Sequence, residues 1–344
     1  MAMIGDEAGS VSDDMCLLCE GTGSLLSDPC PLCEQIAEPT RRRFWCAICR
    51  KDLQSAQSLA VHIQGKRHAQ LYRMSLPALT EHSLFAQLAT GEFRQVIVLT
   101  GAGVSTAAGI PDFRSPGGLF EEINATFGSR FPEVLRHGPE ELLSRRFARL
   151  HPMVWRTEVE PFLRSRKYSA AQPTDIHRFC AWLHRQGLLK RVYTQNVDGL
   201  HLRPELGLPE DSVVECHGAL HDGSIVLYDD PLPKRFDQCC KQDFEAAPAG
   251  SEVDLLLVFG TSLRVAPFCT LPNKVPPGCT RVLVNNNMQH CLRYHGSGRS
   301  WCEGSASKRW RQLLIESDCD SWVTRFFASP AARERSFCLS GKSC

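Results

Sequence analysis

The 344-residue sequence lacks any long apolar run. Its longest candidate, LLLVF at 255–259, has the length of a strand, whereas about 18 apolar residues are needed to cross a bilayer. Residues 1–40 also lack lysine and arginine but contain eight aspartates and glutamates. A secretory signal has basic residues followed by an apolar stretch, so this pattern argues against one. We therefore expect an intracellular protein of the nucleus or cytoplasm, with no membrane association.

Cysteine, in contrast, is abundant, with seventeen residues of which eleven lie beyond residue 179. An odd number of scattered cysteines disfavours a disulfide scaffold and favours a reducing compartment. Charge is also unevenly distributed, because residues 41–75 contain eight lysines and arginines against the single Asp52. The chain therefore begins with an acidic arm that precedes a basic module.

The acidic arm contains two CxxC pairs, Cys16 with Cys19 and Cys30 with Cys33. Four thiolates at this spacing can bind one zinc ion, and they leave no position open for a catalytic water. The glycines that follow the first pair resemble the CxxCxGxG zinc repeat of DnaJ-type chaperones. A flexible arm with four unliganded cysteines is the alternative.

In the basic module, Cys46 and Cys49 are followed by His62 and His68 in FWCAICRKDLQSAQSLAVHIQGKRH. This spacing predicts a cysteine hairpin opposite a helix capped by Ser55, which together form a structural zinc site. The segment resembles the matrin-type zinc fingers, a group whose members often bind double-stranded RNA. The resemblance implies that its basic residues contact RNA phosphates, and a protein-docking finger is the open alternative.

From about residue 85, apolar strands alternate with helical patterns, which is typical of an α/β fold with a mostly parallel sheet. A helix is predicted after Thr174, with apolar residues at helical spacing until Gly187. Most strands end in small or polar residues, and the carboxyl ends of strands in an open α/β sheet form one ligand crevice. The predicted strands are 95–100, 190–194, 213–216, 253–259 and 281–285.

The first predicted strand runs into the turn GAG at 101–103. Backbone N–H groups at such a strand-to-helix turn bind anions, because glycine permits close approach and the helix dipole favours negative charge. Neither a complete GxGxxG motif nor the GK[ST] of a P-loop is present. The turn therefore predicts a phosphate-bearing ligand without identifying it.

Five separated motifs occur in the order GAGVSTAAGIPDFRS, TQNVDGLH, CHG, GTSLRVAPF and RVLVN. Together they resemble the sirtuin family of NAD-dependent protein deacylases over residues 85–325, and within it the deacetylase branch. The resemblance implies a Rossmann-like parallel sheet with helices on both faces, a reduced small domain, and NAD as cosubstrate. We expect an acidic arm at 1–40, a zinc finger at 41–75, a sirtuin-like catalytic domain at 76–328 and a tail at 329–344.

By this resemblance, His217 is the general base, and a histidine pKa of about 6.5 suits that role at neutral pH. Asn196 and Asp198 are implied as catalytic residues that bind and orient the nicotinamide ribose. The implied reaction converts an acyl-lysine protein and NAD to nicotinamide, 2′-O-acyl-ADP-ribose and free lysine without a catalytic metal. The other implied NAD contacts are Gly101, Ala102, Gly103, Ser105, Asp112, Phe113, Arg114, Gln195, Gly260, Thr261, Ser262, Asn285 and Cys319.

The sequence departs from the family after His217. Most sirtuins carry a zinc module with two cysteine pairs there, but the following residues, GALHDGSIV, include no cysteine. The adjacent Cys239 and Cys240 cannot replace two spaced pairs. The next segment, VLYDD, stands where the family has VxFGE, so Tyr228 replaces the aromatic residue and Asp229 the glycine. Binding of the acyl-lysine peptide is the function that these differences put in question.

Three functions follow as hypotheses. The first is an NAD-dependent lysine deacylase, with acetyl as the expected acyl group, in which the N-terminal zinc modules replace the missing brace and target the enzyme to RNA or a protein. The second is an NAD glycohydrolase or ADP-ribosyltransferase that has lost efficient deacylation. The third is an RNA-binding zinc-finger protein with an NAD-binding scaffold core. The presence of His217, Asn196 and Asp198 together favours an enzyme.

Overall fold

The computed structural model divides the chain into two compact units, Met1–Pro77 and Ala78–Cys344. The predicted metal ligands Cys16, Cys19, Cys30, Cys33 and His68 lie outside the described residues, as does most of the predicted tail. No helix among the described residues is long and apolar enough to cross a membrane. The described residues are 24–25, 28–29, 45–46, 49, 51–52, 55–63, 79–165, 170–248, 250–288 and 311–333.

The first unit contains two short antiparallel strand pairs and one helix. Strands β1 (Ser24–Leu25) and β2 (Asp28–Pro29) form one pair. Strands β3 (Trp45–Cys46) and β4 (Lys51–Asp52) form the other. Helix α2 (Ala56–Ile63) follows, and the Ser55 hydroxyl accepts a hydrogen bond from the Ser58 N–H at 3.1 Å. A hairpin and a capped helix are therefore present where the Cys and His spacing predicts them.

The second unit is built on a six-stranded parallel sheet in the order β10-β9-β8-β5-β6-β7. Numbered along the chain within this sheet, the order is 3-2-1-4-5-6, which is the Rossmann arrangement with its topological switch point between β5 and β8. The predicted fold class is confirmed. The strands are β5 (Val96–Thr100), β6 (Leu189–Thr194), β7 (Val213–Glu215), β8 (Leu255–Phe259), β9 (Thr280–Asn285) and β10 (Arg311–Glu316).

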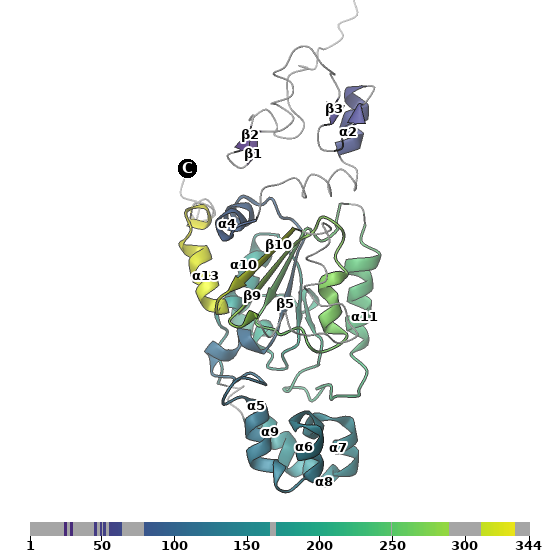
Figure 1. The fold of residues 1–344 in the computed structure, drawn as a ribbon, viewed down its shortest axis with the longest axis vertical. Helices are drawn as coiled ribbons and strands as arrows, with labels where there is room; N and C mark the ends of the chain where they lie inside the picture. The colour runs from purple at the N-terminus through teal and green to yellow at the C-terminus, as the bar shows by residue number, and fades with distance from the viewer. Residues whose placement is uncertain are drawn as a thin grey trace, which may run out of the picture. The chain divides into compact units, whose positions relative to one another are not determined.

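The central strands are apolar along their whole length because both faces of the sheet are covered. On β5, Val96 and Val98 belong to one core cluster, whereas Ile97 and Leu99 belong to the other. Figure 1 shows α4, α10 and α13 on one side of the sheet and α11 on the other. These helices are α4 (Glu81–Thr90), α10 (Asp175–Arg185), α13 (Cys319–Ala328) and α11 (Lys234–Cys240).

Helix α10 begins where it was predicted, directly after Thr174. The Thr174 hydroxyl and the His177 side chain cap the first turn reciprocally. The apolar stripe of α10, which includes Ile176, Phe179 and Leu183, is fully buried. Thr174 also donates a hydrogen bond from its hydroxyl to the Val104 carbonyl at 2.8 Å, so the helix start is fixed to the loop after β5.

Residues 119–165 form a helical module that sequence reasoning did not resolve into elements. It has its own aromatic core, in which the Phe131 and Phe147 rings meet edge to face at 5.1 Å. Figure 1 shows this module beyond the carboxyl ends of the sheet strands. Its elements are α5 (Leu119–Ile123), η3 (Asn124–Gly128), α6 (Pro132–His137), η4 (Pro139–Leu143), α7 (Arg145–Leu150), α8 (Pro152–Val154), η5 (Trp155–Val159) and α9 (Glu160–Ser165).

Candidate active site and zinc site

The loops that follow β5 and β8 pack directly against each other at the switch point. The Gly103 N–H donates to the Gly260 carbonyl at 2.9 Å. A Cβ on Gly103 would lie 2.8 Å from the Gly260 Cα, and a Cβ on Gly101 would lie 2.6 Å from the Thr261 Cβ. Both glycines are therefore required by the contact between the loops, because a side chain at either position would collide with the other loop.

A cavity of about 630 Å³ opens at this edge of the sheet. Gly101, Ser105, Asp198 and Cys319 do not line it; Gly101 contacts the Thr261 loop, and Ser105 and Asp198 support a lining residue. Cys319 is buried at the start of α13. The predicted residues that line the cavity are Ala102, Gly103, Asp112, Phe113, Arg114, Gln195, Asn196, His217, Gly260, Thr261, Ser262 and Asn285.

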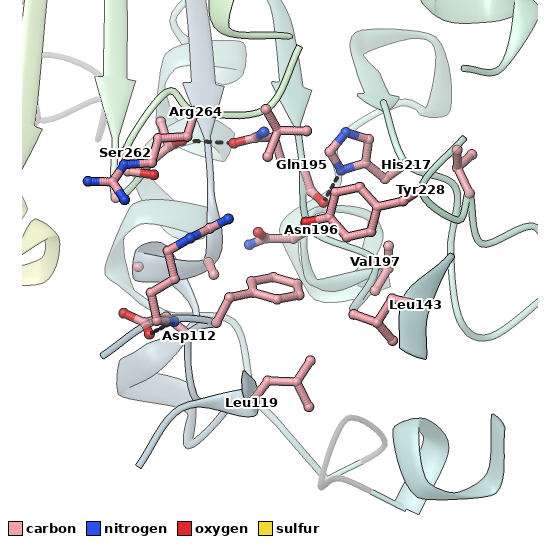
Figure 2. Close-up of a pocket in the computed structure, with 18 of the residues that line it drawn as sticks. Asp112, Leu119, Leu143, Gln195, Asn196, Val197, His217, Tyr228, Ser262 and Arg264 are labelled. Atoms are coloured by element: carbon pink, nitrogen blue, oxygen red, sulfur yellow. Dashed lines mark hydrogen bonds between the residues drawn. The ribbon is translucent and has the colours of Figure 1, made fainter. Parts of the chain in front are cut away.

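His217 lines the cavity, and its orientation is fixed by one hydrogen bond. Its Nδ1 lies 3.1 Å from the Gln195 carbonyl oxygen (Figure 2). A carbonyl can only accept, so Nδ1 carries the proton and Nε2 keeps its lone pair. Burial lowers the pKa of His217 below 6.5, although the hydrogen bond to Gln195 opposes this shift. The imidazole is therefore neutral at pH 7 and has the form that a general base requires.

A chain of hydrogen bonds holds the loop after β6 to the loop after β5. The Asn196 amide donates to the Ser105 hydroxyl at 3.0 Å, and the Ser105 hydroxyl donates to the Asp198 carboxylate at 2.7 Å. Asp198 also accepts from the Leu200 N–H at 3.0 Å. Burial raises the pKa of Asp198 above its usual value, while these bonds lower it. The chain fixes the Asn196 side chain at the cavity surface.

The loops after β6, β8 and β9 are joined in the same way. The Thr261 hydroxyl donates to the Gln195 side-chain oxygen at 2.7 Å, and the Asn285 amide donates to the Thr261 carbonyl at 3.1 Å. We call the lining residues Gln195, Asn196, Thr261, Ser262 and Asn285 the polar wall. Sequence reasoning missed Asn286 and Asn287, which also line the cavity, although a run of asparagines directly after a strand was a usable signal.

In the loop after η2 (Thr106–Ala108), the Asp112 side chain forms hydrogen bonds within the loop itself. The Asp112 carboxylate accepts from the Ser115 N–H at 2.7 Å and from the Ser115 hydroxyl at 2.5 Å. Phe113 packs edge to face on Phe120 at 5.6 Å, and the Arg114 guanidinium lies 5.1 Å from the same ring. All three predicted residues of this loop therefore lie at the cavity, with Asp112 already accepting hydrogen bonds.

The opposite side of the cavity is mainly apolar, and its residues other than Tyr228 were not predicted. We call the lining residues Leu119, Leu143, Leu163, Leu220 and Tyr228 the apolar wall, and the first three come from the helical module. Figure 2 shows Ser262 and Arg264 across the cavity from Leu143 and Val197. The cavity therefore has two chemically different sides, one with hydrogen-bonding groups and one suited to an aliphatic group.

The segment VLYDD is bound to the helical module along one edge. The Tyr228 N–H donates to the Leu143 carbonyl at 3.0 Å, and the Arg145 N–H donates to the Tyr228 carbonyl at 2.9 Å. The Arg145 guanidinium makes a bidentate pair with the Asp230 carboxylate at 2.8 and 2.6 Å. Asp229 has a φ of 73°, in the left-handed region that favours glycine.

In the first unit, three of the predicted zinc ligands come together. The ligand atoms of Cys46, Cys49 and His62 lie within 4.8 Å of one another. The Cys49 N–H also donates to the Cys46 sulfur at 3.3 Å, so the two cysteines are joined across the turn of the hairpin. Two sulfurs and one imidazole nitrogen fit three corners of a tetrahedral zinc site.

Comparison with known proteins gives two family matches and a set of relatives. Residues 101–224 match the Sir2 family model, and residues 44–68 match a zinc finger of C2H2 type, which confirms the predicted sirtuin and zinc-finger resemblances. The NAD-dependent protein deacetylase hst2 of Schizosaccharomyces pombe is 30% identical over 269 residues, which cover 68% of this chain and 71% of that protein. The NAD-dependent protein deacetylase sirtuin-2 of Danio rerio is 31% identical over 251 residues, which cover 61% of this chain.

The coverage of the relatives themselves varies. The alignment covers 60% of the Danio rerio protein. The NAD-dependent deacetylase sir2A of Dictyostelium discoideum is 32% identical over 234 residues, and only 41% of its length is aligned. The relatives therefore extend beyond the region that they share with this chain.

Proposed function

This chain belongs to the Sir2 family, and from that premise we propose that it is an NAD-dependent protein-lysine deacylase with acetyl-lysine as its expected substrate. The observation that carries the proposal is the neutral His217, whose Nε2 is available as a proton acceptor in a cavity at the Rossmann switch point. A buried structural histidine would not require this placement beside Gln195 and Asn196.

The cavity residues fit NAD. The contact of Gly103 with Gly260 brings backbone close to the switch point, where dinucleotides bind in Rossmann folds. The polar wall supplies hydrogen-bond partners for ribose hydroxyls and phosphate oxygens, with Ser262 and Asn285 assigned to the adenosine side. When bound, NAD supplies an activated ribose carbon and, after nicotinamide leaves, the ADP-ribose that accepts the acyl group.

Each side chain then has a defined task. His217 accepts a proton at Nε2 from a ribose hydroxyl, while the Gln195 carbonyl keeps the ring in the required tautomer. The chain from Asn196 through Ser105 to Asp198 positions the nicotinamide ribose. The apolar wall and Phe113 receive the acyl group and exclude water from it. The peptide around the acyl-lysine is assigned to the mouth beside Tyr228.

The test is a product assay with purified protein, an acetylated peptide and NAD. We expect 2′-O-acetyl-ADP-ribose in amounts equal to the lysine released, and none from His217→Ala. The matched control is His82→Ala, which removes an exposed histidine on α4 and should leave turnover unchanged. Nicotinamide release that does not depend on peptide would reject deacylation and support the NAD glycohydrolase or ADP-ribosyltransferase hypothesis.

The zinc finger is assigned a targeting role. Cys46, Cys49 and His62, with His68 as the fourth ligand, are proposed to bind one structural zinc ion, and Cys16, Cys19, Cys30 and Cys33 a second. The basic residues of the finger are proposed to contact RNA or an acidic protein. An intracellular site, nuclear or cytoplasmic, is supported by the free thiols among the described cysteines, which include Cys180, Cys216, Cys239, Cys240, Cys269 and Cys319. Metal analysis should give about two zinc ions per chain.

A further inference from the structure

A second hollow lies on the helical module, separate from the cavity described above. It has a volume of about 310 Å³ and three arginines in its lining. Arg145 and Arg149 are four residues apart on α7, so they project from the same face of the helix. We call this hollow the arginine groove, and it is lined by Arg145, Ala148, Arg149, Pro152, Trp155 and Arg156.

Two of the three arginines of the arginine groove are in no ion pair among the described residues, whereas Arg145 is paired with Asp230. Arg149 and Arg156 are exposed, and neither has a carboxylate within 4.0 Å among the residues that the structure describes. Other arginines of the same module are paired, with Arg130 joined to Glu158 and Arg164 to Glu160. A groove with free guanidiniums is suited to carboxylate or phosphate groups.

Exposed apolar side chains occur next to groove residues in the sequence, and they favour one class of partner, a protein. Five large apolar side chains are exposed among the described residues, and Leu135, Leu150 and Met153 of these belong to the helical module. Leu150 and Met153 directly follow the groove residues Arg149 and Pro152 in the sequence. Arginine, methionine and aromatic residues together are typical of protein-binding surfaces, whereas a nucleic-acid backbone offers nothing to the leucine and methionine.

One residue of the groove, Arg145, contacts residues that line the proposed active site. The Arg145 guanidinium lines the groove and also binds Asp230, which lines the 630 Å³ cavity. The Arg145 N–H donates to the carbonyl of Tyr228, a residue of the apolar wall. Arg149 is close enough to contribute to the lowered pKa of Asp230. A protein segment at the cavity mouth can therefore continue directly onto the groove.

We propose that the arginine groove is a docking site for an acidic segment of the acylated substrate protein, in which carboxylates bind Arg149 and Arg156 and an intervening apolar residue contacts Leu150 or Met153. The identity of the partner as the substrate rests on the proposed deacylase function. The groove would then select among acyl-lysines by the acidity of the flanking sequence, independently of the acyl group.

The test uses three acetyl-lysine peptides of equal length that differ only in one three-residue tract, which is Glu-Leu-Glu, Gln-Leu-Gln or Lys-Leu-Lys. In successive sets of peptides the tract is moved along the sequence, on the N-terminal and then on the C-terminal side of the acetyl-lysine. We expect one placement at which the acidic peptide has a KM about three- to tenfold lower than the neutral one, with kcat unchanged. The double variant Arg149→Glu/Arg156→Glu should reverse the preference and leave the neutral peptide unaffected.

The matched control is Arg94→Glu/Arg185→Glu, which changes the net charge equally at exposed positions next to the amino ends of β5 and β6. This control should keep the acidic preference. Equal KM values for the three peptides at every placement, or loss of the preference in both double variants, would overturn the proposal.

Direct binding separates this proposal from the proposed function. Trp155 lines the groove, so the unacetylated acidic peptide should change tryptophan fluorescence in the full chain but not in Trp155→Phe. This result is expected even where no peptide is deacylated. Absence of saturable binding of the acidic peptide would overturn the proposal. Displacement of the bound acidic peptide by RNA, at a lower concentration than unlabelled acidic peptide requires, would also overturn it. Neither result depends on turnover.

Discussion

The two walls of the cavity are held in place by different forces. The polar wall is a network of side-chain hydrogen bonds between loops, from Thr261 to Gln195 and from Asn285 to the Thr261 backbone. The apolar wall depends on packing within the helical module and on the Arg145–Asp230 pair. A network of directional bonds tolerates little displacement, whereas packed leucines adapt to groups of different size. The polar wall thus suits a constant cosubstrate, and the apolar wall suits a variable acyl group.

The largest loss of activity is expected when the contact between Gly103 and Gly260 is broken. Gly103→Ala places a Cβ 2.8 Å from the Gly260 Cα, so the two loops must separate. We expect about a 100-fold loss in kcat/KM for NAD, since a displacement of about 1 Å can cost that much. Gly109→Ala is the control, because no atom lies within 4 Å of its added Cβ although its φ is 81°. Similar losses in both variants would contradict the importance of the contact between the loops, because an alanine at position 109 meets no other loop.

The region behind the polar wall predicts a pH dependence of stability. His177 and His201 are buried with their rings 4.4 Å apart, and burial lowers the pKa of His201 to about 3 and that of His177 well below 6.5. Below pH 6.5 the unfolded chain binds more protons than the folded chain, so stability falls as pH falls. Between pH 7.5 and 5.5 we expect the two histidines to contribute a loss of about 2.5 kcal/mol to the free energy of unfolding. Glu92 and Glu215 contribute with the opposite sign, because burial raises the pKa of each to about 7.

Urea denaturation at the two pH values measures this loss. His177→Phe should remove about half of the histidine contribution, so its stability should fall by about 1.3 kcal/mol less than that of the wild type between the two pH values. His82→Gln, at an exposed position, should behave like the wild type. The same pH dependence in His177→Phe and in the wild type would contradict the neutral buried pair.

A smaller change in activity is expected when the Arg145–Asp230 ion pair, which supports the apolar wall, is removed. Arg145→Met keeps the aliphatic stem but releases Asp230, and with it the segment that contains Tyr228. We expect KM for an acetylated peptide to rise about fivefold, with KM for NAD unchanged. Steady-state kinetics, with the peptide and NAD each varied in turn, measure the two KM values separately. A parallel rise in both KM values would mean that the walls do not behave separately.

The smallest effect concerns Asp229, whose φ of 73° is strained for a residue with a side chain. Asp229→Gly should raise the free energy of unfolding by about 0.5 kcal/mol, because relief of strain exceeds the added chain entropy. Asp229→Asn removes the charge while keeping tolerance for this conformation, and should leave stability unchanged. Equal stabilisation by both variants, in urea denaturation, would assign the effect to charge.

The polar wall was predictable because its residues follow strands that are apolar along their whole length. Motifs at 101–114, 195–198 and 260–262 are local, and the rule that carboxyl ends converge places them together. Strand β10 was missed because it has one neighbour, β9, and its RQLLIE sequence alternates irregularly between exposed and half-buried residues. An edge strand lacks the continuous apolar signal of a central one.

The apolar wall had no such signal. In the sequence, Leu119, Leu143 and Leu163 look like ordinary core residues of a helical module, and they do belong to that core as well as to the cavity lining. The Arg145–Asp230 pair joins residues 85 positions apart, so neither residue shows its partner in the local sequence. Long-range pairing of this kind is decided by the packing of the module against VLYDD.

The most direct test of the account is the pH dependence of kcat/KM for the formation of 2′-O-acetyl-ADP-ribose, which reports the ionisation of the free enzyme. The account predicts activity that rises with pH and levels off, with an apparent pKa below 6.5 because burial lowers the pKa of His217, and no product from His217→Ala. A rate independent of pH between 5 and 8, or an active His217→Ala variant, would contradict it.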